Sequence, residues 1–420
     1  MRPVGERAAY IHPARVLFPL GLGTAFSLMG DATLYTVLPT HTVEAGVTLG
    51  GVGVLLGVNR AVRLFLNGPA GLAYDRWPRR RIFLPALFLG ALSTAIYAAT
   101  RGFWPLFIGR LLWGLAWSGI WVGGATMVLD VATVRDRGRW MGLYQTWFFL
   151  GSALGSLGGG VLTDWLGYAL TMWIGAALTA LGGVVAWLLL PETRGARESA
   201  DVAPVVGEHV ANPKPSPGNV RQPGIRANAR LWLAVSLQGV NRFTISGVLS
   251  ATLGLLAEER LRLSGMAAGV ATLTGVLMAS RTVLSMVSAP LSGVLSDRVE
   301  SRWKVVAWGV AAGVMGMALL AWGVPGAIFV GVLVVAISRG SVQSLATTLT
   351  GDLVSHVQRG QAIGLLNTVG DFGSAIGPSV AYALLPWIGL RGLYLFCAAM
   401  FAVSLFWILR DIVIREPEIR

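Results

Sequence analysis

Charged side chains are scarce in this sequence. Asp, Glu, Lys and Arg together make up 13% of its 420 residues, whereas a soluble domain carries about 25%. Lysine is nearly absent, because 31 of the 33 basic residues are Arg. Cysteine occurs once, at Cys397 within an apolar stretch, which excludes an intrachain disulfide. Apolar residues make up 54% of the chain, so its surface needs a lipid environment and a water-soluble fold is excluded.

Sequence motifs for catalysis are absent too. We find no cluster of metal ligands, no nucleophile beside a general base and no nucleotide-binding loop. The glycine-rich run GSALGSLGGG, residues 151–160, lies inside an apolar stretch rather than after a strand, so it does not fit a phosphate-binding loop. We therefore expect a protein that is not an enzyme and that binds no metal and no cofactor.

Long apolar stretches dominate what is present. A stretch of about 20 mainly apolar residues is long enough to cross a membrane as a helix. Twelve such stretches occur, at residues 16–39, 47–73, 82–100, 104–129, 140–163, 169–190, 231–257, 265–295, 304–324, 326–352, 361–386 and 391–410. The first is too long for a cleavable signal peptide and contains Asp31. The predicted fold class is an all-α integral membrane protein with twelve transmembrane helices.

One long polar segment, residues 191–230, interrupts the apolar pattern. It contains six prolines among charged and small residues, a composition that cannot form a packed core. The segment predicts three regions along the chain. These are a six-helix bundle over residues 1–190, a cytoplasmic linker over residues 191–230 and a second six-helix bundle over residues 231–420.

The arginines predict the orientation in the membrane. If the N-terminus is cytoplasmic, the inner loops contain most of the basic residues, and the outer loops contain only Arg101, Arg260, Arg262 and Arg391. This is the asymmetry of the positive-inside rule, so we expect both termini in the cytoplasm and the chain in the cell inner (plasma) membrane. The net charge of +13 then needs no nucleic acid. The expected partners of a monomeric protein are the lipid bilayer and a small-molecule substrate.

An internal repeat relates the two predicted bundles. Eight residue pairs share a spacing of 222 positions: Asp75 and Asp297, Gly71 and Gly293, Arg76 and Arg298, Asp130 and Asp352, Gly138 and Gly360, Gly142 and Gly364, Gly151 and Gly373, and Gly155 and Gly377. Because each bundle has an even number of helices, the two share one orientation and are related by an axis along the membrane normal. The substrate site is then expected between them, near the bilayer midplane.

The loops after the second and eighth predicted helices carry a family signature. They read GLAYDRWPRRR from Gly71 and GVLSDRVESRWK from Gly293. Both resemble the G-x-x-x-D-R-x-G-R-[KR] loop of the major facilitator superfamily, although Pro78 stands where that family prefers Gly. The resemblance implies a transporter fold and a conformational latch, with topology-setting charges as the alternative. The implied latch residues are Gly71, Asp75, Arg76, Arg79, Asp130, Gly293, Asp297, Arg298 and Asp352.

Glycine spacing in two further helices extends the resemblance. The glycines are Gly151, Gly155 and Gly159 on the predicted fifth helix, and Gly373 and Gly377 on the eleventh. Residues four apart share one helical face, and a face without side chains allows close packing of another helix. The spacing resembles the antiporter signature of the superfamily, except that Ser156 replaces its Pro, and it implies export. Generic small-residue packing is the alternative.

Two opposite charges inside the predicted helices form a candidate proton-coupling pair. A charge at the bilayer centre costs roughly 2.5–3.5 kcal/mol, so each one needs a function or a partner. Asp31 on the first helix and Arg110 on the fourth lie at similar depth and can pair. Asp31-Ala32-Thr33 also resembles the Asp-x-Thr element of drug–proton antiporters, which implies that Asp31 binds the proton. A static structural ion pair is the alternative.

Further polar residues predict a wet interior that holds the substrate. Asn59 and Arg63 are four residues apart on the second helix, with Arg60 beside them, and they form a polar stripe. The full predicted cavity set is Asn59, Arg60, Arg63, Trp117, Gln238, Asn241, Arg242, Arg281, Arg339 and Asp371. Trp117 is included because an indole can stack on a flat ligand. Packing between helices is the alternative for each.

Two transport hypotheses follow from these residues. The leading one is proton-coupled export of small amphipathic organic molecules by alternating access, based on Asp31 and the glycine spacing. The second is import or exchange of organic or phosphorylated anions, because Arg outnumbers Asp inside the membrane and predicts a positive potential. A receptor with this fold but no transport is less favoured, since the repeat and the buried charges suit alternating access.

Overall fold

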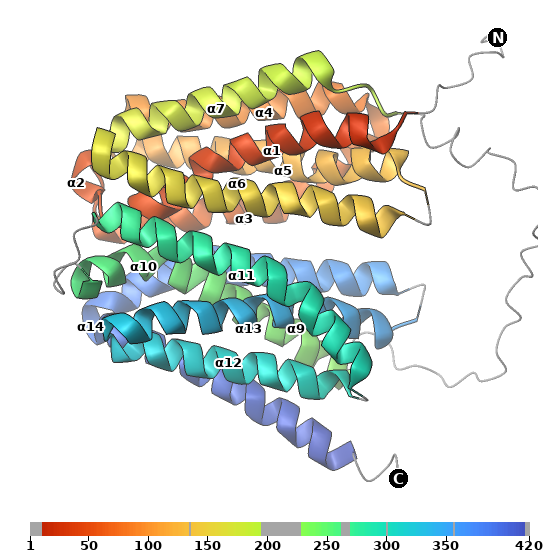
Figure 1. Ribbon diagram of the computed structural model, residues 1–420, viewed down its shortest axis with the longest axis vertical. Coiled ribbons are helices and arrows are strands. Elements are labelled where there is room, and N and C mark those ends of the chain that lie inside the picture. Colours follow the sequence, from red (N-terminus) through yellow and green to blue (C-terminus); the bar gives the residue numbers. More distant parts are fainter. Residues whose placement is uncertain are drawn as a thin grey trace, which may run out of the picture.

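The described part of the chain is a bundle of long helices. The computed structural model describes residues 11–133, 136–194, 228–261, 269–299, 301–355 and 358–415. Within these ranges the chain contains helices and no strand. The helices form two groups that lie side by side, one before and one after the predicted linker (Figure 1). The start of α1 and the end of α14 lie on the same side of the molecule (Figure 1).

The first group follows the predicted helices to within a few residues. Its elements are α1 (Pro13–Val37), α2 (Thr42–Ala45), α3 (Leu49–Arg76), α4 (Arg79–Ala99), α5 (Phe103–Val131), α6 (Arg137–Leu166) and α7 (Tyr168–Leu189). The short helix α2 was not predicted, because four residues carry no detectable apolar period. Prolines lie inside α1, α3 and α4 without ending them, as membrane helices tolerate.

The second group departs from the prediction in two places. Its elements are α9 (Ala229–Asn241), η2 (Arg242–Leu249), α10 (Ser250–Leu256), η3 (Ala257–Leu261), α11 (Val270–Arg298), α12 (Arg302–Trp322), α13 (Pro325–Asp352) and α14 (Arg359–Arg415). The seventh predicted helix is not uniformly α-helical, since η2 and η3 are π-helical. The predicted eleventh and twelfth helices join in α14, where Gly389 interrupts the helix with a φ of 63°, a value that glycine adopts without strain.

The predicted fold class, an all-α integral membrane protein, is confirmed. Ten helices in the described ranges are long and apolar enough to cross a membrane. One of them is α14 with its interruption, and α6, which is 30 residues long and rich in glycine, is not among the ten. Twelve crossings therefore stay a prediction. The division at residues 190 and 231 also stays a prediction, because residues 195–227 of the linker lie outside the described part.

The two groups touch at the end away from the termini. The contacts join α6 to α11 and α3 to α14. There, a β-carbon on Gly160 would meet the backbone of Ala271, and one on Gly57 would meet that of Ala375. Asp164 Oδ2 accepts a hydrogen bond from the backbone N–H of Thr272 at 2.7 Å. These contacts close the molecule on one side.

Toward the termini the same helices diverge. Figure 1 shows α6 and α11 close together at one end and apart at the end that carries the termini. Gly142 and Gly160 are 18 residues apart, which is five helical turns, so they share one face of α6. Yet a β-carbon on Gly142 would have no neighbour within 4 Å, and the same holds for Gly293 on α11. The structure is therefore closed at one end and open at the other.

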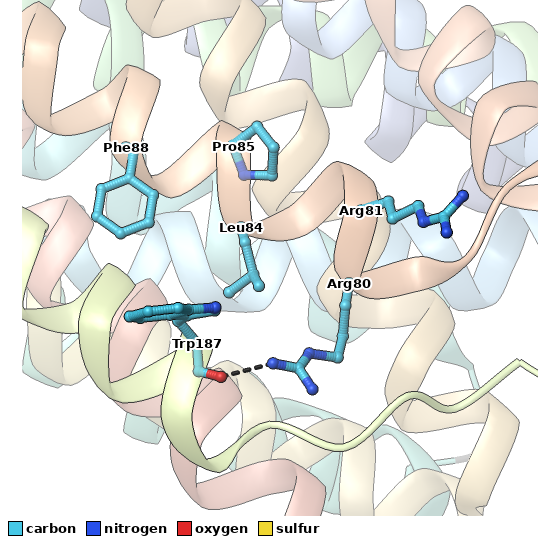
Figure 2. Close-up of a pocket in the computed structure, with 6 residues that line it drawn as sticks. All are labelled: Arg80, Arg81, Leu84, Pro85, Phe88 and Trp187. Carbon is cyan, nitrogen blue, oxygen red and sulfur yellow. Dashed lines mark hydrogen bonds between the residues drawn. The ribbon is translucent and has the colours of Figure 1, made fainter.

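A groove also opens on the surface of the first group, away from the second. It lies between the start of α4 and the end of α7, has a volume of about 660 Å³, and is drawn in Figure 2. Its walls are Arg80, Arg81, Leu84, Pro85, Phe88 and Trp187. None of these residues was singled out as a site residue from the sequence.

Candidate functional site

Asp31 and Arg110 meet inside the first helix group. Arg110 Nη1 on α5 donates to Asp31 Oδ1 on α1 at 2.5 Å. The Arg110 side chain is fully buried, and that of Asp31 is 15% exposed. Arg110 Nε also donates to the carbonyl of Leu55 at 2.9 Å. A buried guanidinium without a counter-charge is very costly, so Asp31 is needed as its partner, while a role in proton coupling stays a prediction.

Tyr35 connects this pair to the polar stripe of α3. It lies one turn after Asp31 on α1, with Arg60 Cζ 4.8 Å and Arg110 Cζ 5.1 Å from its ring centroid. Its hydroxyl donates to the carbonyl of Leu56 at 2.6 Å. Two cations over one aromatic ring form an attractive contact with each. Tyr35 is not among the predicted site residues, although its spacing of four from Asp31 places both on one helical face.

The second acid within the predicted membrane helices, Asp371, joins the two helix groups. Its Oδ1 lies 3.2 Å from Arg242 Nη1 and 3.6 Å from Arg63 Nη2. Arg242 belongs to the second group, like Asp371 on α14, whereas Arg63 lies on α3 of the first group. The three side chains are 14–24% exposed. One carboxylate is thus shared by two guanidinium groups across the interface.

Arg60 crosses the same interface to backbone oxygens. Its Nη1 donates to the carbonyl of Ser246 at 2.5 Å and to that of Ser374 at 3.1 Å. Ser246 lies in η2, and Arg281 Nη1 donates to the carbonyl of Ile245 in the same segment at 3.4 Å. In a π-helical segment the backbone hydrogen bonds span five residues, whereas they span four in an α-helix. Such segments are frequent at functional sites. The segment η2 therefore supplies acceptors to two arginines.

Positive charge exceeds negative charge around Asp371. Arg339 on α13 interacts electrostatically with Arg281, Arg242 and Arg60. The arginine cluster is defined here as Arg60, Arg63, Arg242, Arg281 and Arg339. Two of these guanidinium groups pair with Asp371 and the other three add positive charge beside them, so the cluster is suited to an anionic group from outside the protein.

Half of the predicted cavity residues do not line an open surface. The buried ones, with their exposed fractions, are Asn59 (2%), Trp117 (4%), Gln238 (1%), Asn241 (2%) and Arg281 (5%). The prediction for Trp117 needs the clearest correction. Its ring stacks between Trp113 and Trp121 with centroids 6.0 and 5.9 Å away, and contacts Phe148. This indole fills the core of the first group, where it leaves no face free for a ligand.

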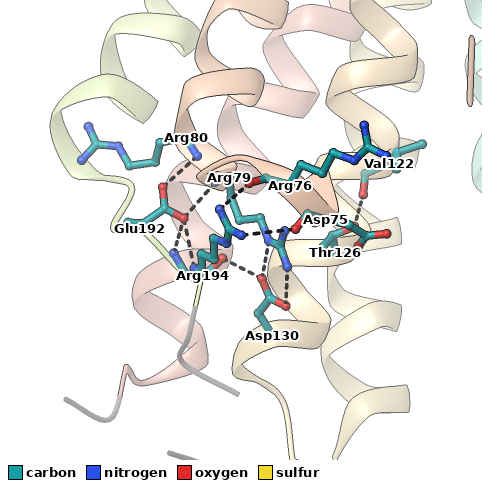
Figure 3. Close-up of polar contacts among 10 residues, drawn as sticks. Asp75, Arg76, Arg79, Arg80, Val122, Thr126, Asp130, Glu192 and Arg194 are labelled. Carbon is teal, nitrogen blue, oxygen red and sulfur yellow. Dashed lines mark hydrogen bonds and ion pairs between the residues drawn. The ribbon is translucent and has the colours of Figure 1, made fainter. Parts of the chain in front are cut away.

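The predicted latch of the first group is formed within that group. Arg79 Nε at the start of α4 donates to Asp130 Oδ2 at the end of α5 at 2.9 Å (Figure 3). Asp75 and Arg76 are exposed, and their side chains have no polar partner among the described residues. A β-carbon on Gly71 would likewise have no neighbour. The role of Gly71, Asp75 and Arg76 in a latch therefore stays a prediction.

Three residues that follow α7 add contacts around the Arg79–Asp130 pair, namely Glu192, Thr193 and Arg194. Glu192 accepts hydrogen bonds from the backbone N–H groups of Arg79 and the next residue at 2.9 and 3.1 Å. Thr193 Oγ1 donates to Asp130 Oδ2 at 3.0 Å, and Arg194 Nη1 donates to the carbonyl of Arg76 at 2.6 Å. Figure 3 shows these contacts around the end of α3. These residues belong to the predicted linker, because composition alone does not reveal such distant partners.

The second group has the equivalent pair. Arg302 at the start of α12 bonds Asp352 at the end of α13, and its Nη2 lies 3.6 Å from Asp297 Oδ1. The partner of Asp352 is thus Arg302, the first residue of α12, as the partner of Asp130 is Arg79, the first residue of α4. Arg298 and Gly293, also predicted latch residues, have no polar contact or close neighbour among the described residues.

The predicted packing glycines lie at close helix contacts. A β-carbon on Gly151 or Gly155 of α6 would meet the α1 backbone, and one on Gly159 would meet Thr33. In the second group, Gly373 and Gly377 of α14 lie against the backbone at Gly239, Phe243 and Gly247. The same device therefore joins α6 to α1 and α14 to the helix that contains η2.

Comparisons with known proteins agree with this architecture. The sequence matches the Major Facilitator Superfamily over residues 20–285 and 231–419. It is 26% identical to the tetracycline resistance protein, class C, of Escherichia coli, over 90% of this chain and 94% of that protein. It is 34% identical to a probable 4-methylmuconolactone transporter of Cupriavidus pinatubonensis, but over 31% of this chain and 30% of that protein.

A solved structure shares the whole fold. A bacterial homolog to the human lysosomal transporter Spinster, in an inward-facing and occupied conformation, superimposes with a TM-score of 0.76. The match covers 94% of this chain and 96% of that one at 15% identity. The chain belongs to the Major Facilitator Superfamily, as its loops and glycines indicated.

Proposed function

We propose that this protein is a secondary active transporter that exports small organic molecules carrying an anionic group in exchange for protons. The observation that carries the proposal is the arginine cluster, in which Arg63 and Arg242 pair with Asp371 and three further guanidinium groups add positive charge. Guanidinium groups bind carboxylates and phosphates through paired, charge-assisted hydrogen bonds. On this reading the protein is not an enzyme, and both termini lie on the cytoplasmic side of the inner membrane.

The relatives support the class of substrate. The names of the two similar proteins refer to tetracycline resistance and to 4-methylmuconolactone. Both compounds are small organic molecules, and resistance to a toxic compound is what its export would give. These names support export as the direction, with import or exchange of anions as the second candidate.

Asp371 provides a means of coupling the anion to the two helix groups. Asp371 shares its charge between Arg242 and Arg63, which belong to different groups. A substrate carboxylate that replaced Asp371 at these arginines would bridge the groups itself. Protonation of Asp31 would remove its ionic attraction for Arg110 and loosen α1 from α5. Substrate binding at the arginine cluster and protonation of Asp31 would then favour the same movement of one helix group against the other.

Ligand-dependent thermal unfolding of the detergent-purified protein tests the anion preference. Organic carboxylates and lipophilic cations are compared at equal concentration, since a ligand at a hundred times its Kd stabilises by about 2.7 kcal/mol. We expect carboxylates to stabilise the wild type, and Arg63→Gln or Arg242→Gln to abolish the effect. Arg230→Gln is the matched control, because Arg230 pairs with Asp411 outside the cluster. Stabilisation by cations alone would refute the proposal.

Proton exchange is tested separately in proteoliposomes with a pH-sensitive dye. A carboxylate found in the thermal screen should drive proton movement in the wild type and in Asp411→Asn. Asp31→Asn should retain carboxylate binding but lose proton movement. Unchanged coupling in Asp31→Asn would remove Asp31 from the mechanism. Movement of substrate and protons in the same direction would instead support the importer.

A further inference from the structure

The groove between α4 and α7 has one polar and one apolar end. Arg80 and Arg81 lie at the start of α4, whereas Leu84, Phe88 and Trp187 line the remainder (Figure 2). The helices with the main contacts to the second group are α3, α6 and α1, so this groove faces away from the interface between the groups. Phe88 is 40% and Trp187 is 59% exposed. In a membrane, such a surface lies against lipid.

The positive charge of this groove is not neutralised by an acid. Arg80 Nη2 donates to the carbonyl of Trp187 at 2.5 Å, a contact drawn in Figure 2. Glu192 binds the backbone N–H of Arg80, while the Arg80 side chain extends away from that carboxylate (Figure 3). Arg81 is exposed and has no polar partner among the described residues. No Asp or Glu lines the groove.

The depth of these residues matches the two parts of a phospholipid. The helix rises about 1.5 Å per residue, so Leu84 and Phe88 lie roughly 6 and 12 Å deeper than Arg80. From Ile82 onward α4 is apolar, which places the two arginines at the level of the lipid headgroups. Pro85 also has no N–H to donate to the carbonyl of Arg81, so this oxygen lacks its usual helical donor.

We propose that this groove is a binding site for an anionic phospholipid with a hydroxyl-bearing headgroup, such as phosphatidylglycerol. The phosphate contacts Arg80 and Arg81, and an acyl chain follows Phe88 and Trp187. Basic pockets at the ends of membrane helices bind anionic headgroups in this way. The proposal does not depend on the transported substrate.

A second groove on the surface differs from this one in its charge, and the comparison shows why an anionic lipid is expected here. It has a volume of about 400 Å³ and contains two arginines, but Asp411 also lines it. Arg230 pairs with Asp411 at 2.8 Å, and Arg410 lies 5.0 Å from the ring centroid of Trp407. Its positive charge is therefore partly neutralised within the protein. We expect this groove to bind neutral and anionic lipids about equally.

Native mass spectrometry of the full chain tests the proposal. The detergent-purified protein is titrated with phosphatidylglycerol, phosphatidylcholine or soluble glycerol 3-phosphate. We expect one phosphatidylglycerol to bind more tightly than phosphatidylcholine, and glycerol 3-phosphate not to compete for it. Arg80→Gln/Arg81→Gln should weaken this binding by about fivefold per arginine, and Arg80→Lys/Arg81→Lys should retain most of it.

Two matched variants separate the groove from bulk charge and from misfolding. Arg137→Gln/Arg139→Gln removes the same charge at the start of α6, outside the groove, and should leave the preference unchanged. Trp187→Ala keeps the backbone contact of Arg80 but removes an apolar wall, so it should weaken phosphatidylglycerol binding without abolishing the preference. Equal loss in both double Gln variants, equal binding of phosphatidylcholine, or full competition by glycerol 3-phosphate would overturn the proposal.

Discussion

At the scale of single residues, the cost of a buried charge organises the site. Arg110 is fully buried and its charge is balanced by Asp31 alone among its described contacts. Removing one member of such a pair leaves an uncompensated charge, whereas replacing both by apolar residues is far less costly. The Asp31–Arg110 contact therefore has a structural consequence that can be measured apart from transport.

Asp31→Leu should lower the free energy of unfolding by about 3 kcal/mol, because it leaves the Arg110 guanidinium buried without a partner. The double variant Asp31→Leu/Arg110→Met should be more stable than Asp31→Leu alone. Thermal unfolding of both proteins in one detergent measures the difference. A double variant less stable than Asp31→Leu would show that Arg110 is held mainly by the carbonyl of Leu55 and the ring of Tyr35.

The sequence predicted some of these residues and not others. A charged residue within an apolar stretch is easy to recognise in the sequence. This is why the sequence predicts Asp31, Arg110, Arg63 and Asp371. Which charges pair is a tertiary property, so the shared contact of Asp371 with both groups was not predicted. The burial of Trp117 was not predicted either, because the sequence does not show whether an indole on a helix faces a ligand or a neighbouring helix.

At the scale of helices, glycine spacing controls how closely α6 approaches α1. A β-carbon on Gly155 would lie 2.6 Å from the Cα of Met29, which is backbone and cannot rotate away. Three residues further along the same helix, Gly158 has no neighbour within 4 Å. The two positions therefore form a matched pair for separating close packing from helix propensity.

Gly155→Ala should destabilise the protein by about 1–3 kcal/mol through overpacking. Gly158→Ala should stabilise it by up to about 1 kcal/mol, because Ala favours the helix over Gly. Thermal unfolding of the two variants beside the wild type measures both effects. Equal responses would mean that α6 and α1 separate easily at Gly155 and that this glycine has no packing role.

Glu192 caps a helix from 113 positions away in the chain, counted to Arg79. Pro78, which precedes α4, offers no side-chain hydrogen bond, so Glu192 takes the place of a local cap. Glu192→Ala should lower the free energy of unfolding by about 1–2 kcal/mol, and Glu44→Ala, at an exposed position on α2, should have little effect. Proteolysis at the loops on the side of the termini should also rise in Glu192→Ala alone. Equal stability of the two variants would contradict this capping role.

Helix positions followed from apolar length, but their interruptions did not. The π-helical segment η2 is stabilised by contacts with Arg60 and Arg281 on other helices, and those contacts are invisible in the local sequence. Apolar residues flank Gly389 on both sides. The length of the apolar stretches therefore predicts a break between two helices there, but it does not predict the backbone conformation of the break.

At the scale of the whole molecule, the two groups are related by the repeat that the sequence contains, but their relative tilt is not encoded in any local pattern. The observed contacts define one state through Asp164 with Thr272, and Gly160 with Ala271, at the end away from the termini. A second state must close the end that is open here if the chain works by alternating access.

The helical period identifies which residues would meet in that second state. Gly160 and Gly275 lie in the closed interface of α6 and α11. Counting 18 residues, or five turns, toward the termini along each helix leads to Gly142 and Gly293 on the same two faces. Both positions now have free space around them. They are therefore the two glycines that closure at this end would bring together. The predicted latch loops and the spaced glycines would then take part in the same conformational change.

Cross-linking measures this closure directly. In a Cys397→Ala background, Gly142→Cys/Gly293→Cys should cross-link poorly with a short bifunctional maleimide in the empty protein, and more strongly when a transported carboxylate is bound. The pair Asp164→Cys/Thr272→Cys, now in direct contact, should respond in the opposite direction. Opposite changes at the two ends are the signature of rocking about the arginine cluster, because a rigid receptor would leave both unchanged and a general loosening would lower both.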